Sequence, residues 1–244
     1  MTDKRDDIED LLPFFTHFKG LPHQIAGVRE LYETMPASLN SRKAKWKDTY
    51  RAAGKQPEKA PPSNPLKVPY FSQRDSATQH ALRMCFSSSC AMLLEALRPG
   101  TLTGPNGDDA YLGRVLRYGD TTDAAAQIKA LASYGVQATF TQRASFDTLR
   151  QQIDKGVPVP IGVLHHGHVS KPQGGGHWIV AVGYTDDAIT VHDPFGEMDL
   201  VNGGYVNTSI GSGAAQRYSE RNWGRRWMVE GAGSGWWIEI SAGT

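Results

Sequence analysis

The chain has 244 residues, of which 39% are hydrophobic and 21% are charged, a composition typical of a globular protein. Its 26 basic and 25 acidic side chains leave a formal charge of +1, which gives no electrostatic reason to expect a nucleic-acid partner. No apolar run reaches the roughly 18 residues that a bilayer span needs, and the polar N-terminus does not resemble a secretory signal. We therefore expect a soluble protein, made in the cytoplasm without a signal peptide and without membrane insertion.

The N-terminal quarter differs in pattern from the rest of the chain. Residues 22–35 and 38–50 carry apolar residues at helical spacing. Residues 54–65 are rich in proline and charge, which is typical of a linker. We therefore expect a helical N-terminal segment with its linker over residues 1–62 and one larger domain over residues 63–244.

The larger domain begins with helical patterns and ends with strand patterns. After an extended stretch at 66–73, helices are expected at 85–97, 108–118, 122–134 and 145–154, with Thr122 and Ser145 as N-caps. Short β-branched or aromatic runs predict strands at 158–164, 177–184, 188–193 and 235–240. Helices followed by an antiparallel sheet indicate an α+β fold.

The two cysteines, Cys85 and Cys90, must be explained as single thiols. Five residues apart on one helix, they point in different directions and cannot reach disulfide geometry. Cys85 stands at the expected helix start, where the helix dipole favours the reactive thiolate. Cys90 lies among leucines, which favours a buried and inert thiol. Cys85 is therefore the candidate nucleophile, although a small core residue is the alternative for a cysteine taken alone.

A histidine and an aspartate belong to two consecutive strands. His177 opens one strand, and Asp193 closes the next. If Tyr184 faces Ala188 across the turn, His177 and Asp193 become diagonal neighbours on one face of the sheet. His192 then points to the opposite face, whereas a register slip of one residue would exchange it for Asp193.

These residues have the chemistry of a thiol hydrolase. A nucleophile at Cys85, a base at His177 and an orienting carboxylate at Asp193 form a Cys-His-Asp triad. Gln73, twelve residues before the cysteine, can offer its side-chain amide to a developing oxyanion, although a solvated loop residue is the plain alternative.

The residues around the candidate base suggest where a substrate binds. The glycines before His177 would let a substrate backbone approach closely, unless they only make a flexible loop. The candidate substrate-binding residues are Gly175, Gly176 and Trp178.

Four stretches resemble the papain-like peptidases, and in detail the peptidase domains that trim double-glycine leaders from bacteriocins. These stretches are Val68–Asp75, Cys85–Met92, Gly176–Tyr184 and Val191–Gly196, within residues 66–200. The resemblance implies a papain-like fold and a cysteine peptidase that needs no cofactor. One stretch departs from the family pattern, because Cys-Phe-Ser-Ser-Ser at 85–89 stands where Cys-Gly-Pro-Thr-Ser is usual. The departure concerns the substrate pocket and leaves the nucleophile in place.

A more distant similarity connects the chain with stand-alone relatives carried by bacteriophages. It rests on Leu164–Gly167, Gly174–Trp178, Asp199–Tyr205 and Arg226–Gly231. This similarity implies an endolysin-like or virion-associated lysin that cleaves peptides of peptidoglycan, acting on the wall after release or as part of a phage particle. The expected partner is then a peptidoglycan peptide or another peptide substrate.

Three other functions stay open at this stage. A zinc-dependent wall hydrolase could use His165 and His168 with either His166 or a carboxylate, although these follow no helical His-Glu-x-x-His pattern, and we expect no metal. A catalytically silent virion or wall-binding protein could stack sugars on the C-terminal tryptophans, although so many tryptophans favour a core role. A peptidase that processes leader peptides is the third.

Overall fold

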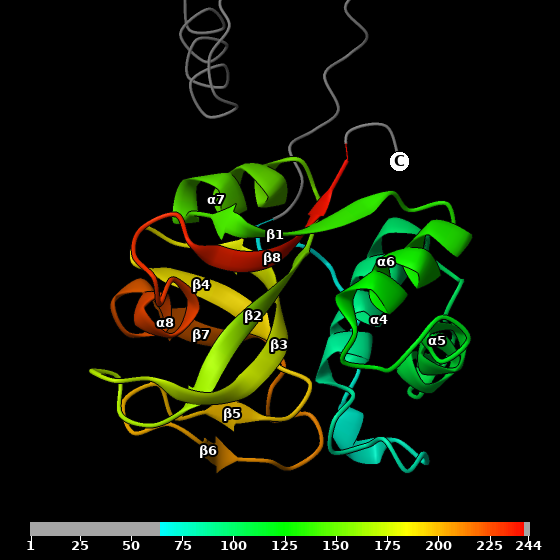
Figure 1. The fold of residues 1–244 in the computed structure, drawn as a ribbon, viewed down its shortest axis with the longest axis horizontal. Helices are drawn as coiled ribbons and strands as arrows, with labels where there is room; N and C mark the ends of the chain where they lie inside the picture. The colour runs from blue at the N-terminus through cyan, green and yellow to red at the C-terminus, as the bar shows by residue number, and fades with distance from the viewer. Residues whose placement is uncertain (1–63, 242–244) are drawn as a thin grey trace, which may run out of the picture. The chain divides into compact units, whose positions relative to one another are not determined.

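The computed structural model describes residues 64–241, which form an α+β fold of helices packed on an antiparallel sheet (Figure 1). A short 3-10 helix, η2 (Gln73–Asp75), precedes the first long helix. The α-helices of this part of the chain are α4 (Cys85–Leu97), α5 (Gly107–Val115), α6 (Ala124–Ser133), α7 (Phe146–Asp154) and α8 (Glu220–Trp227). The helices expected at 22–35 and 38–50, and the boundary expected near residue 62, lie outside the described residues.

Six strands form one antiparallel sheet in the order β1-β8-β2-β3-β4-β7. Their bounds are β1 (Ala138–Ala144), β2 (Val159–His166), β3 (Gln173–Tyr184), β4 (Ala188–His192), β7 (Gln216–Ser219) and β8 (Gly235–Ile240). A separate pair, β5 (Glu197–Met198) and β6 (Tyr205–Asn207), lies beyond the end of β4 in the chain. The antiparallel sheet and the helices that precede it confirm the predicted fold class.

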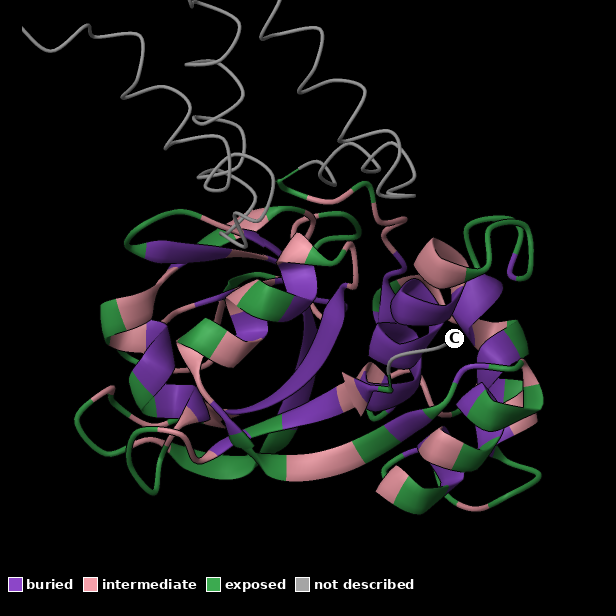
Figure 2. Ribbon diagram, turned by 90° about the horizontal axis from the view of Figure 1, so that it is seen from above, coloured by how far each residue is buried: buried purple, intermediate pink, exposed green. Residues whose placement is uncertain are grey.

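The sheet has a hydrophobic core on each of its two faces. On β3, Trp178 and Val180 belong to the core beneath α4, α5 and α6, whereas Ile179 and Ala181 belong to the core that also contains residues of α7 and α8. This alternation follows from the period of two in a strand. Figure 2 shows the result, with the central strands and the inner side of α4 buried.

Capping side chains mark the starts of α6 and α7. Ser145 caps α7 as expected, and it exchanges hydrogen bonds with Thr148 in a capping box. The cap expected at Thr122 is wrong, because α6 begins at Ala124 and the carboxylate of Asp123 accepts a hydrogen bond from the Ala125 amide. The side chain of Thr122 instead bonds to Asp120 in the preceding turn.

Several elements were missing from the sequence expectation. β1 is an edge strand whose central residues are mostly exposed, so it lacks the apolar alternation of an inner strand. β7 has only four residues, and the polar helix α8 follows it directly. Residues 66–72 form no regular element, and β3 begins at Gln173 rather than at His177.

No helix within residues 64–241 combines the length and the apolar character that crossing a bilayer requires.

Candidate active site

Cys85 is the first residue of α4, as expected, and it is partly exposed. It lines a cleft of about 620 Å³ that also reaches His177 and Gln73. Cys90 lies one and a half turns further on, is fully buried and forms no disulfide. Burial raises the pKa of its thiol, so this sulfur stays protonated. The two cysteines therefore differ as the sequence indicated, one facing the cleft and the other inside the core.

The hairpin of β3 and β4 corrects the expected turn. Tyr184 pairs with Ile189, whereas we predicted from the sequence that it would pair with Ala188. A bulge between Ala181 and Gly183 shifts the register by one residue. This shift compensates for the one-residue error at the turn. Beyond the bulge, where Val180 pairs with His192, the strands therefore have the predicted register.

Beyond the bulge, the hairpin brings His177 and Asp193 together. Val180 pairs with His192, and the Nε2 atom of His177 lies 2.7 Å from the Oδ1 atom of Asp193. His177 is 4% exposed, and Asp193 is fully buried. Both side chains lie on the face opposite to that of His192, because residues alternate along a strand.

Asp193 is held by four hydrogen bonds. Its Oδ1 atom accepts from His177 and from the backbone amides of Phe195 at 2.9 Å and Gly196 at 3.4 Å. Its Oδ2 atom accepts from the hydroxyl of Tyr218 at 3.4 Å. These donors fix the orientation of the carboxylate toward the imidazole.

The charge state of His177 follows from its surroundings. Burial on its own would lower its pKa, but the carboxylate of Asp193, which is hydrogen-bonded to the ring, and the neighbouring Cys85 side chain raise the pKa to about 10. The imidazole is therefore protonated at neutral pH and lies between a carboxylate and a sulfur. This arrangement suits an imidazolium paired with a thiolate.

His192 has a structural role on the other face of the sheet. Its Nδ1 atom accepts a hydrogen bond from the Ala215 amide at 2.9 Å, so its Nε2 atom carries the hydrogen that is donated to the Val68 carbonyl at 3.1 Å. Burial lowers its pKa. A neutral histidine with both nitrogens used cannot replace Asp193.

Gln73 is the first residue of η2 and is 1% exposed. Its backbone amide donates to the Pro194 carbonyl at 2.9 Å, which ties the turn to the residue after Asp193. Its Nε2 atom donates one hydrogen to the Ala81 carbonyl at 2.7 Å. Since an amide nitrogen carries two hydrogens, the second is available in the cleft that contains Cys85.

The three residues expected to bind substrate all line the cleft. A Cβ atom added to Gly175 or Gly176 would meet no atom within 4 Å, and neither residue has a positive φ angle. Neither backbone strain nor packing therefore requires glycine there, which leaves room for a ligand close to the main chain. Trp178 is only 8% exposed and stacks on Phe86 with ring centres 3.6 Å apart, so it is mainly part of the core.

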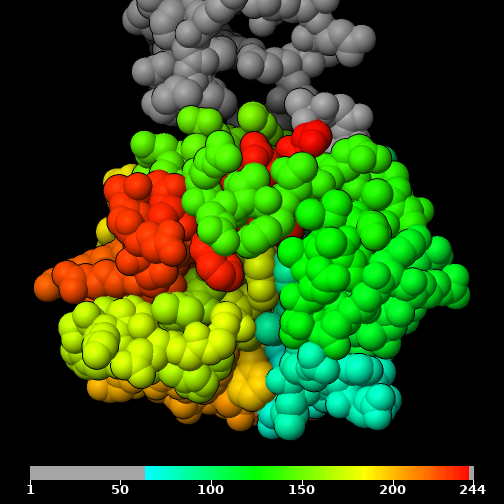
Figure 3. All heavy atoms as spheres, viewed as in Figure 1, coloured from blue at the N-terminus to red at the C-terminus, as the bar shows by residue number. Residues whose placement is uncertain are grey.

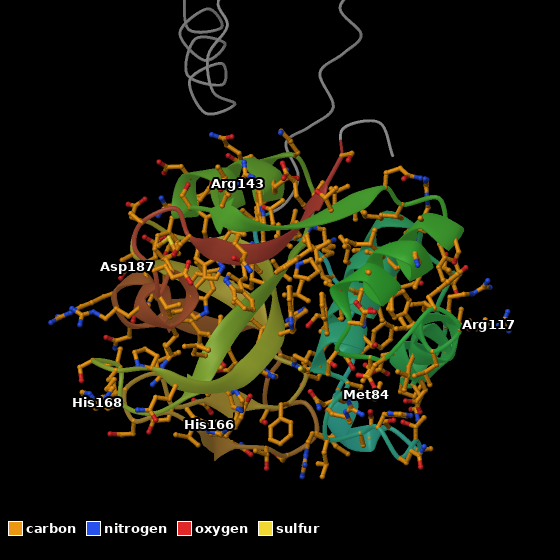
Figure 4. All side chains as sticks on the ribbon, in the orientation of Figure 1. Met84, Arg117, Arg143, His166, His168 and Asp187 are labelled. Carbon is orange, nitrogen blue, oxygen red and sulfur yellow. The ribbon has the colours of Figure 1, made fainter. Side chains whose placement is uncertain are left out.

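The cleft separates the helical part from the sheet part of the molecule. In Figure 4, Met84 marks the residue before Cys85 on one side, and His166 marks the end of β2 on the other. The surface is hollowed between the segment around β2 and β3 and the helical segments in the space-filling view (Figure 3). The cleft is open to solvent from this side.

The aromatic residues around His177 were not predicted as part of the site. The ring of Tyr205 stands perpendicular to His177 at 5.8 Å, Phe195 lies at 6.4 Å, and His165 lies at 5.4 Å. Burial, with the nearby histidines, lowers the pKa of His165 to about 4, so this ring is neutral. The sequence signals for Phe195 were its place two residues after Asp193 and within the resembling stretch Val191–Gly196, and Tyr205 had none beyond the resembling stretch that it closes.

The histidines considered for zinc do not converge. The ring centres of His165 and His166 lie 3.8 Å apart with the rings tilted by 41°, while the Nδ1 atom of His168 bonds to the Ser170 hydroxyl. Within residues 64–241, no three side chains of the metal-binding types lie close enough together to hold an ion.

Comparisons with solved structures find papain-like peptidases. A C39-like peptidase from Bacillus anthracis is 13% identical, with a TM-score of 0.47, and the match covers 72% of this chain and 94% of that one. A double glycine motif protease from an AMS/PCAT transporter, solved with its leader peptide, is 16% identical, with a TM-score of 0.41 and coverage of 71% and 91%. The peptidase domain of Streptococcus ComA is 18% identical, with a TM-score of 0.42 and coverage of 66% and 92%.

No curated protein matches the chain. The model of the Peptidase_C39 like family matches residues 65–219, which is more than half of the chain and includes every candidate site residue. The chain belongs to the Peptidase_C39 like family and is a cysteine peptidase.

Proposed function

We propose that this peptidase cleaves peptide bonds with Cys85 as the nucleophile, His177 as the acid and base, and Asp193 as the residue that orients His177. The observation that carries the proposal is the 2.7 Å contact of His177 with Asp193, in a cleft that Cys85 also lines. The raised pKa of His177, caused by Asp193 and Cys85 against the effect of burial, supports a thiolate–imidazolium pair at neutral pH.

In the first half of the proposed reaction, the sulfur of Cys85 attacks the carbonyl carbon of the scissile bond, and a carbon–sulfur bond forms. The carbonyl oxygen becomes an oxyanion, which accepts a hydrogen bond from the free amide hydrogen of Gln73. His177 then gives its proton to the leaving nitrogen as the carbon–nitrogen bond breaks. The product of this half is a thioester at Cys85 and a free amine.

In the second half, water attacks the thioester, and His177 takes the proton of that water. The carbon–sulfur bond breaks, which releases the carboxylic acid and restores the pair. Asp193 stabilises the imidazolium in both halves without taking a proton.

For the biological substrate, we propose the peptides of bacterial peptidoglycan, in an endolysin-like or virion-associated role. The support is the similarity of Leu164–Gly167, Asp199–Tyr205 and Arg226–Gly231 to stand-alone phage relatives. Processing of a leader peptide is the second candidate, supported by the resemblance of Val68–Asp75 and Cys85–Met92 to leader-trimming peptidases.

The experiment uses the purified full chain with sacculi from several types of bacteria and with a synthetic peptide that contains a double glycine. We expect new amino groups, without new reducing ends, to appear in the digested sacculi, and no release by the Cys85→Ala variant. Reducing ends without amino groups would mean glycan cleavage and would contradict the peptidase assignment for this substrate. Cleavage of the double-glycine peptide with untouched sacculi would select leader processing.

A further inference from the structure

A second, smaller pocket of about 150 Å³ lies next to the catalytic cleft. Its floor and walls come from β2, β3, the start of β8, the end of α8 and the turn after it. The residues that matter here are Gly162, Leu164, Gly176, Trp227, Val229 and Trp236. Apart from one arginine, all of its lining residues are apolar or glycine.

The arginine has no free hydrogen-bond donor to offer to the pocket. Arg226 is fully buried, and its guanidinium donates hydrogen bonds to backbone carbonyls at the end of β2 and in two loops. The acceptors are Leu200, Leu164, His166, Gly167 and Val201. Because its donors are used in this way, Arg226 supports the wall of the pocket and presents no free N–H donor to a ligand.

The pocket and the cleft are continuous. Gly176 and Trp236 line both of them, and Gly176 is bonded directly to His177. Consecutive Cα atoms are about 3.8 Å apart, and an extended residue spans about 3.3 Å. A peptide whose scissile bond meets His177 therefore reaches the pocket with a residue one or two positions from that bond.

The shape of the pocket depends on glycine residues, which have no side chain to fill it. A Cβ atom added to Gly162 would lie 3.3 Å from the ring of Trp178 and 3.4 Å from the Cβ atom of Trp236, so a larger residue there would press on both tryptophans. Above Gly176, the space is open. Trp236 itself is 36% exposed, which is unusual beside Trp223, Trp227 and Trp237 in the core.

We propose that this pocket binds one apolar side chain of the substrate, of the size of leucine, methionine or phenylalanine, within two residues of the scissile bond. An apolar cavity of about 150 Å³ is large enough for a benzene ring. Burying such a side chain removes apolar surface from water and so stabilises the bound peptide. A double glycine, or the small and charged residues of a wall peptide, would leave the pocket empty. The inference rests on the proposed Cys85 peptidase chemistry and not on either proposed biological substrate, and a confirmed apolar preference would count against both of those substrates.

The test is a series of fluorogenic peptides that differ at one position and carry glycine, alanine, leucine or phenylalanine. The position is varied in turn over the two residues on each side of the bond. At one of these positions, leucine or phenylalanine is expected to raise kcat/KM at least about 10-fold over glycine. Equal kcat/KM values at all four positions would overturn the proposal.

Two variants of one wall residue locate the preference. Val229→Trp fills the pocket, so the ratio of kcat/KM for the leucine or phenylalanine peptide over the glycine peptide should fall toward 1. Val229→Ala enlarges the pocket and should favour phenylalanine over leucine. Val201→Trp is the matched control, because Val201 is 42% exposed, compared with 44% for Val229, and lines neither pocket. An unchanged preference in Val229→Trp would also overturn the proposal.

Failure of this inference can be told apart from failure of the proposed function. The rate at which iodoacetamide alkylates Cys85 reports an intact nucleophile without any peptide, and it should be the same in wild type and Val229→Trp. If Cys85→Ala still cleaves peptides, the proposed function is wrong. If Cys85→Ala is inactive and the wild type shows no apolar preference, only the pocket assignment is wrong.

Discussion

The two sides of the cleft position their reactive groups in different ways. On the helical side, Cys85 depends on where a single helix begins, and it remains partly exposed. On the sheet side, His177 and Asp193 depend on the pairing of two strands, and both are buried. The nucleophile is therefore set by local structure, whereas the base and its carboxylate are set by strand register and by a network of buried hydrogen bonds.

The largest effect is expected at the nucleophile. Cys85→Ala and Cys85→Ser should lower kcat by at least about 1,000-fold in the peptide assay, because no other group on the helical side replaces the thiolate. Cys90→Ala is the matched control on the same helix, and it should keep most of the activity while losing about 1 kcal/mol of unfolding free energy. Full activity in Cys85→Ala, or an inactive but folded Cys90→Ala, would reverse the assignment of the two thiols.

A graded loss is expected on the sheet side. His177→Ala should be nearly inactive, because it removes the proton donor and acceptor. Asp193→Ala should keep a small but measurable kcat, since Cys85 and the rest of the cleft remain in place. Comparing single-turnover rates of the two variants checks this order. If Asp193→Ala matched the wild type, the buried network around its carboxylate would have no part in the reaction.

The pH dependence of stability should also come from the sheet side. The pKa of His177 is raised from 6.5 to about 10 in the folded state, by Asp193 and Cys85 against burial. Its stabilising effect is therefore complete below about pH 6.5 and is lost as the pH rises toward 10. The Tm of the wild type should fall across this range more steeply than the Tm of His177→Gln. Parallel Tm curves would show that the folded state does not favour the imidazolium.

The smallest effect on catalysis is expected at the neighbouring histidine. His192→Ala should change kcat by less than about fivefold and lower the unfolding free energy by about 1–3 kcal/mol, because the Val68 carbonyl and the Ala215 amide lose their partner. His168→Ala, at an exposed site, is the control and should change neither quantity. A strong loss of activity in a stable His192→Ala would mean that the register of the hairpin is wrong.

Much of the helical side could be predicted from the sequence. The bounds of α4 matched the expected 85–97, because leucines at helical spacing and the following Pro-Gly mark a helix and its end without reference to other elements. The cap of α7 at Ser145 was equally local. The cap of α6 was misplaced by one residue, because Thr122 and Asp123 are both good capping residues and only the backbone decides between them.

The sheet side was harder to predict. β1 and β7 carry little apolar pattern, since both are edge strands. The bulge between Ala181 and Gly183 has no clear sequence signal, and the register at Asp193 came out right only because the bulge offset the misplaced turn.

The sequence by itself determined the class of the protein and the four candidate residues, because Gln73, Cys85, His177 and Asp193 stand beside local signals of a turn, a helix start and two strand ends. The tertiary structure alone decided which groups meet. Four features depend on residues that are far apart in the chain. They are the hydrogen bond from Tyr218 to Asp193, the contact of Tyr205 with His177, the lowered pKa of His165, and the apolar pocket beside Gly176. Burial, hydrogen-bond partners and pocket shape depend on contacts across the sheet, which no local pattern of residues encodes.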